Sequence, residues 1–99
     1  MKANVAIQIL PAAPNDQEVV RIVDEVIDYI ASTGLYYYVG PCETAIEGDD
    51  IHQLMEIVEN CMLIANRAGS DSVSAYVKLG YRPEGNVLGI DEKTTTHHQ

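Results

Sequence analysis

Apolar and polar residues alternate along the first extended segment of the chain. A period of two is the signature of a half-buried strand, whose successive side chains point to opposite sides. Over residues 3–10 one side carries Val5, Ile7 and Ile9 and the other carries Ala6, Gln8 and Leu10. Pro11 and Pro14 follow, and proline does not continue a strand interior. We therefore predict a strand over residues 3–10.

Two later stretches carry apolar residues at helical spacing. The first begins at Asn15, a residue type favoured as N-cap, and Glu18 stands at the position that completes a capping box. This stretch ends at Gly34. The second begins at Asp50 and ends at Gly69. Each stretch has a polar opposite side, so both are predicted to be amphipathic helices.

Further extended segments lie between and after the helices. Residues 36–39 and 43–47 flank the turn pair Gly40-Pro41 and are predicted to form a hairpin. Residues 72–79 alternate again and predict a last strand, and residues 87–90 suggest a short additional edge segment.

The order strand, helix, strand, strand, helix, strand predicts a single α+β domain. Two split βαβ units give the ferredoxin-like βαββαβ sandwich, a four-stranded antiparallel sheet with two helices on one face. The right-handed crossover rule places the first and third strands in the centre. We assign residues 1–90 to this domain and residues 91–99 to a polar tail.

The sheet face opposite the helices, called here the open face, is the predicted functional surface. Strand parity places on it Ala6, Gln8, Leu10, Tyr36, Tyr38, Ala45, Glu47, Ser74, Tyr76 and Lys78. So aromatic a face is expected to dock on a partner, most simply a second copy of the chain. Glu47 and Gln8 are expected to lie near one another among the tyrosine rings and to bind a flat polar heterocycle. Alternatively, Glu47 only pairs with Lys78 or with a charge of another subunit.

Composition narrows the class of partner. Six Lys and Arg against fifteen Asp and Glu give a formal net charge of −9, which disfavours nucleic acid binding. No segment is long and apolar enough to cross a membrane. The two cysteines lack the spacing of metal ligands. Two cysteines without a disulfide pattern suit the reducing cytoplasm, where we expect the protein to be located. No catalytic motif is present, so we expect no enzyme activity and no cofactor.

The segment from Gly34 to Gly48, GLYYYVGPCETAIEG, resembles the core signature of the YkoF-like thiamine-binding family. The resemblance extends over about residues 3–82 and implies the same ferredoxin-like fold. It further implies homotetramers, built as dimers of dimers through their open faces. The ligand that it implies is thiamine or its hydroxymethylpyrimidine half. Thr44, Glu47 and Gly48 are the matching motif positions, to which strand parity adds Gln8, Tyr38 and Tyr76.

Three functions follow from these observations. The first is non-catalytic binding of thiamine or hydroxymethylpyrimidine at an oligomer interface, as a carrier or sensor. The second is a ligand-free assembly or regulatory module whose open face is buried by association. The third is a small ferredoxin-like enzyme, with His52 or Glu47 as its base.

Overall fold

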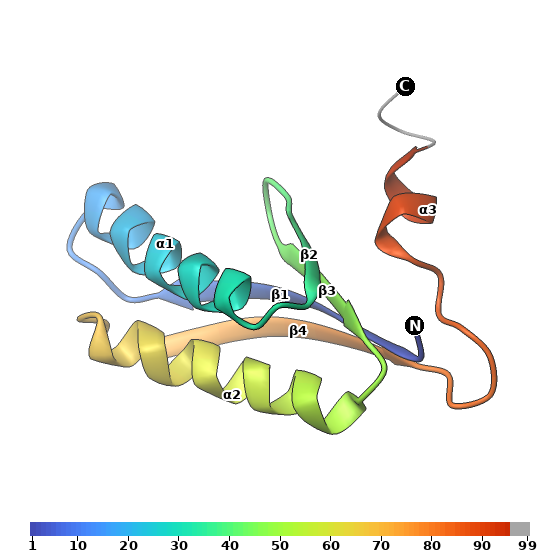
Figure 1. Cartoon of the computed structure of the whole chain (residues 1–99). Helices are drawn as coiled ribbons and strands as arrows, with labels where there is room; N and C mark the ends of the chain where they lie inside the picture. The colour runs from blue at the N-terminus through green and yellow to red at the C-terminus, as the bar shows by residue number, and fades with distance from the viewer. Residues whose placement is uncertain (96–99) are drawn as a thin grey trace.

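The computed structural model describes residues 1–95 of the chain. The elements follow the predicted order and end with one short additional helix (Figure 1). Their bounds are β1 Ala3–Pro11, α1 Asp16–Ser32, β2 Tyr36–Val39, β3 Thr44–Gly48, α2 Ile51–Arg67, β4 Val73–Tyr81 and α3 Ile90–Thr95.

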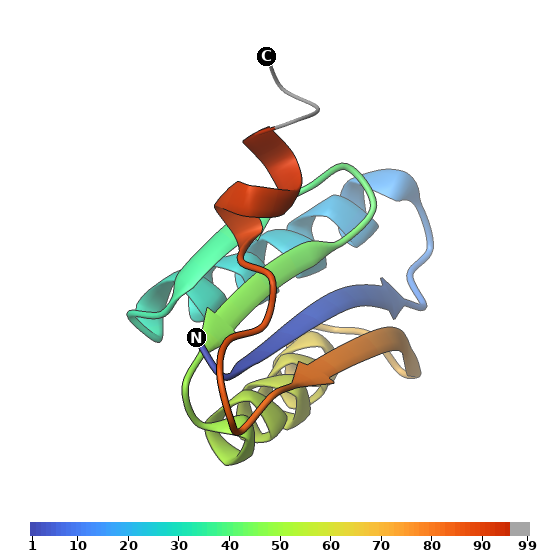
Figure 2. The same ribbon diagram turned by 90° about the vertical axis from the view of Figure 1, so that its right-hand side faces the viewer.

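The four strands form one antiparallel sheet in the order β2-β3-β1-β4. α1 and α2 cover one face of it, and the chain after β4 crosses the opposite face (Figure 2). The first and third strands are central, as the crossover rule requires. The predicted ferredoxin-like βαββαβ sandwich is therefore confirmed.

The helix ends carry the predicted caps. The Asn15 side chain accepts a hydrogen bond from the Glu18 amide, and the Asp50 side chain accepts one from the His52 amide. Each bond satisfies a backbone donor that has no partner within its helix. Gly34 has φ +78°, the left-handed conformation that glycine adopts without steric cost after a helix.

The hydrophobic core lies between the sheet and the two long helices. Alternate residues of β1 and β3 meet the apolar stripes of α1 and α2 there, and Tyr37 packs against the same cluster. The buried members are Ala3, Val5, Ile7, Ile22, Val26, Ile30, Ile46, Leu54, Ile57, Cys61 and Ala65.

The buried thiol of Cys61 makes the folded state less stable at alkaline pH. Burial raises the pKa of Cys61 from 9.0 to about 12. Below pH 9.0 the thiol keeps its proton in both the folded and the unfolded chain. Between pH 9.0 and about 12 the unfolded chain loses this proton while the folded chain keeps it, so the stability of the fold decreases as pH rises. We expect urea denaturation to show a greater loss of stability between pH 8 and about pH 10.5 for the parent than for Cys61→Ala.

Cys42 provides the control for this experiment because its side chain is exposed. The variant Cys42→Ala should keep the alkaline loss of the parent. An equal loss in the parent and in Cys61→Ala would contradict the role given to the buried thiol.

The chain after β4 forms what we call the C-terminal strap, residues 82–95. The edge strand suggested over residues 87–90 is wrong, because Ile90 begins α3. The backbone amides of Arg82 and Val87 donate to the carbonyls of Lys2 and Met1 at 2.7 and 2.8 Å, so the strap runs beside the start of β1. The predicted tail, residues 91–99, contributes to α3 as far as residue 95, and residues 96–99 lie outside the described part.

Candidate ligand-binding site

Strand register builds the floor of a hollow on the open face. Ala45 of β3 pairs with Tyr38 on one side and with Ala6 on the other, and Ala6 pairs with Lys78 of β4. One row of the sheet therefore presents a tyrosine, two alanines and a lysine. Because a methyl group fills little space, the two central positions lie lower than the larger side chains beside them.

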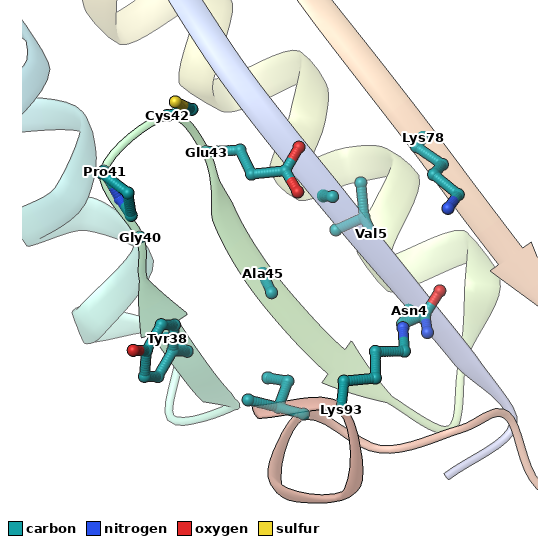
Figure 3. A pocket seen from close by; sticks show the side chains of 12 residues that line it. Asn4, Val5, Tyr38, Gly40, Pro41, Cys42, Glu43, Ala45, Lys78 and Lys93 are labelled. Carbon is teal, nitrogen blue, oxygen red and sulfur yellow. The ribbon is translucent and has the colours of Figure 1, made fainter. Parts of the chain in front are cut away.

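The hollow is a pocket of about 470 Å³, within the usual size range for small-molecule sites. We call it the open-face pocket (Figure 3). The turn from Gly40 to Glu43 forms one wall, and α3 of the strap forms another. Its lining residues are Asn4, Val5, Ala6, Tyr38, Gly40, Pro41, Cys42, Glu43, Ala45, Lys78, Ile90 and Lys93.

The turn at the rim is tight because residue 40 is glycine. The Gly40 amide donates a hydrogen bond to the Glu43 carbonyl at 2.8 Å. A Cβ atom at residue 40 would lie 2.9 Å from that carbonyl oxygen, closer than real Cβ contacts allow. The glycine thus permits the turn that brings Cys42 and Glu43 to the pocket.

The strap is held over the open face by two contacts to the sheet. The Ile90 amide donates to Oε2 of Glu47 at 3.0 Å, and the Ile90 side chain is only 4% exposed. The Tyr36 hydroxyl donates to Oδ1 of Asp91 at 2.5 Å. That hydrogen bond raises the pKa of Tyr36, since the carboxylate favours the protonated phenol. These contacts fix the wall that carries Lys93.

The strand register confirms the predicted open face. Its residues do not all line the pocket, because some lie beneath the strap and others lie elsewhere on the sheet. Tyr38 lines the open-face pocket. Glu47 is buried beneath the strap, where it accepts the Ile90 hydrogen bond. Tyr76 lies on the same face but outside the pocket lining, and it is 72% exposed.

The predicted proximity of Gln8 and Glu47 is wrong. Glu47 pairs with Asn4 and not with Gln8, which pairs with Tyr76. Gln8 is four residues further along β1, or about 13 Å at roughly 3.3 Å per residue. Thr44 cannot place its hydroxyl beside Glu47, because residues separated by three positions in a strand face opposite sides.

Thr44 and Gln8 instead line a second cavity of about 350 Å³ between the end of β1, α1 and the same turn. Gly48 ends β3, and a Cβ atom there would lie 3.4 Å from the Leu35 side chain, an ordinary contact distance. The suggested Glu47–Lys78 ion pair is not formed within the described residues.

Asn4, Glu43 and Lys93 line the pocket but were not singled out from the sequence. Strand parity extends the open face to Asn4 and Glu43 and offered a signal for both. Lys93 had no such signal, because its place depends on how the strap folds back across the sheet.

His52, named from the sequence as a candidate base, does not line this pocket. His52 is exposed on α2, where Nε2 lies 3.2 Å from Glu56 Oε1. Within residues 1–95, no group of three or more His, Cys, Asp or Glu side chains is arranged to hold a metal ion. In the same part of the chain, no helix has the length and apolar character to cross a membrane.

The fold and the hollow on its open face define a small ferredoxin-like domain with a concave surface on its sheet. The model of the family "Thiamine-binding protein" matches residues 5–98, and the chain therefore belongs to this family.

Similar proteins agree with this assignment. A UPF0045 protein of Clostridium perfringens is 42% identical over 90 residues, which cover 91% of this chain and 90% of that protein. A domain of unknown function, DUF77, from Bacillus cereus has a TM-score of 0.86 at 28% identity, covering 100% of this chain and 92% of that one. The crystal structure of a candidate thiamine biosynthesis or salvage protein from Thermotoga maritima has a TM-score of 0.83 at 26% identity, covering 99% and 100%.

Proposed function

We propose that this protein binds thiamine or its hydroxymethylpyrimidine half in the open-face pocket, without catalysis, as a cytoplasmic carrier or sensor. The observation that carries the proposal is that the segment resembling the family signature builds the pocket. Tyr38, the turn from Gly40 to Glu43, and Ala45 supply its floor and one wall. Membership of the thiamine-binding family supports the same ligand class.

The pocket offers the groups that an aminopyrimidine needs. The Tyr38 ring provides a surface for stacking, and the alanine floor leaves room for a flat ring. The Glu43 carboxylate accepts hydrogen bonds from an exocyclic amine, and the Asn4 amide both donates and accepts. Glu47 acts indirectly in this proposal, because its carboxylate holds the strap through the Ile90 amide.

Association of several copies forms part of the proposal. Leu10 and Tyr76 remain 39% and 72% exposed on the open face, outside the pocket lining. Apolar side chains on a sheet face favour contact with a second such face. We therefore propose a homotetramer, formed as a dimer of dimers, in which partners cover the rest of this face.

Filling the pocket should weaken binding. Ala6 lies at the centre of the row, between Ala45 and Lys78, so Ala6→Leu places a larger side chain where the ring would lie. Overpacking costs about 1–3 kcal/mol, which corresponds to a loss of affinity of about 5- to 150-fold. The measurement is calorimetric titration with hydroxymethylpyrimidine and with thiamine.

Ala31→Leu is the matched control, because Ala31 is exposed on α1, outside the pocket lining. Light scattering should establish that all three proteins have the same oligomeric state, which separates a filled pocket from a broken interface. Unchanged affinity in a folded Ala6→Leu protein would show that the ligand lies elsewhere. If the parent binds neither compound, the proposed function is wrong.

A further inference from the structure

The open-face pocket concentrates positive charge in a protein that is otherwise strongly acidic. The chain has three lysines and a formal net charge of −9. Two of the three, Lys78 and Lys93, line this one pocket. Lys78 comes from β4 at the sheet edge, and Lys93 comes from the strap.

The pocket carboxylates do not neutralise these amines. Among the described residues, no carboxylate oxygen lies within ion-pair distance of Lys78 or Lys93. Glu47 accepts its hydrogen bond from the Ile90 amide. Glu43 stands at the turn beside Cys42, whereas Lys93 reaches from α3 across the pocket toward Asn4 (Figure 3).

The two ends of the pocket therefore carry different kinds of polar group. The turn supplies a carboxylate that accepts hydrogen bonds, while the Asn4 end supplies donors and positive charge. Two ammonium groups facing one small space repel each other, and an anion between them relieves that repulsion. Lysine amines bind phosphate through charge-assisted hydrogen bonds.

We infer that Lys78 and Lys93, with the Asn4 amide, form an anion-binding subsite, and that the preferred ligand is the phosphate ester of the pyrimidine. This inference rests on the proposed function and refines its ligand class. The pyrimidine ring lies against Tyr38 and Glu43, and its phosphate lies between the two amines. The same amines disfavour a ligand that brings a positive charge to this end of the pocket.

The test compares hydroxymethylpyrimidine with its monophosphate, and thiamine with its monophosphate, by calorimetric titration at low ionic strength. The parent should bind each phosphate ester at least about tenfold more tightly than the unphosphorylated compound. This preference should shrink as salt is added, because salt screens the charge interaction. Inorganic phosphate should compete only weakly, since it lacks the ring.

Lys78→Met and Lys93→Met should each lose most of the preference for the phosphate while still binding the unphosphorylated ring. Lys2→Met removes the same charge outside the pocket lining and should keep the preference. If the parent binds both forms equally, or if the lysine variants keep the preference, the inference is overturned and the proposed function stands. Absence of binding by all four compounds overturns both.

Discussion

Ile90→Asp should weaken ligand binding by about a hundredfold, a loss of about 2.8 kcal/mol. The parent side chain is 4% exposed, and a carboxylate in its place would be buried beside Glu47, whose Oε2 lies 3.0 Å from the residue 90 amide. Two like charges held in so dry a place repel each other, so the strap should leave the sheet. The pocket then loses one wall and Lys93. Calorimetric titration with hydroxymethylpyrimidine and with its phosphate ester measures the loss.

Leu88→Asp introduces the same charge two residues earlier in the strap. Leu88 is 56% exposed, so this variant should bind like the parent. Limited trypsin digestion gives an independent readout, because cleavage after Lys93 in α3 requires the strap to open locally. Trypsin should cut the Ile90→Asp variant faster than it cuts the parent or the Leu88→Asp variant. Equal binding and equal cleavage in all three would show that the strap does not shape the site.

Leu54→Ala should destabilise the fold by about 2–5 kcal/mol, the usual range for removing a buried leucine side chain. Leu54 has no exposed surface and lies in α2 facing the sheet, within the main core cluster. Total stabilities of about 5–15 kcal/mol are typical of domains. This one substitution would therefore remove a large part of the stability. Urea denaturation followed by circular dichroism measures the difference in free energy of unfolding.

Leu63→Ala makes the same chemical change on the same helix. Leu63 is 49% exposed, and alanine is a good helix former, so the effect should stay within about 0.5 kcal/mol. Similar losses in the two variants would mean that α2 does not present Leu54 to the core as described.

The fold could be predicted because local signals agreed with one another. Asn15 and Asp50 begin the helices that they were expected to cap, and Gly34 adopts the left-handed conformation expected of it. Alternation along β1 separated core from open face correctly. Each of these signals depends on residues close in sequence, which a single chain displays directly.

The site was less predictable because it depends on contacts between distant residues. Parity shows which face a side chain occupies but not which residue lies opposite, so Gln8 was placed beside Glu47 where the register puts Asn4. Thr44 came from the resemblance alone, and alternation places it on the other face. Ile90 ends the short apolar run of residues 87–90, which suggested an edge segment and gave no sign that Ile90 would be buried against Glu47.

β3 pairs with β1 along its whole length, and only the turn that joins β2 to β3 extends beyond this pairing. β3 pairs with β1 from Ala3 to Ile7, while β1 continues to Pro11 with β4 alone beside it. The turn from Gly40 to Glu43 borders both the open-face pocket and the cavity behind it. Because this turn is shared, a displacement of it toward one face would widen one hollow and narrow the other. Occupants of the two hollows would therefore oppose each other, and to the same degree in both directions.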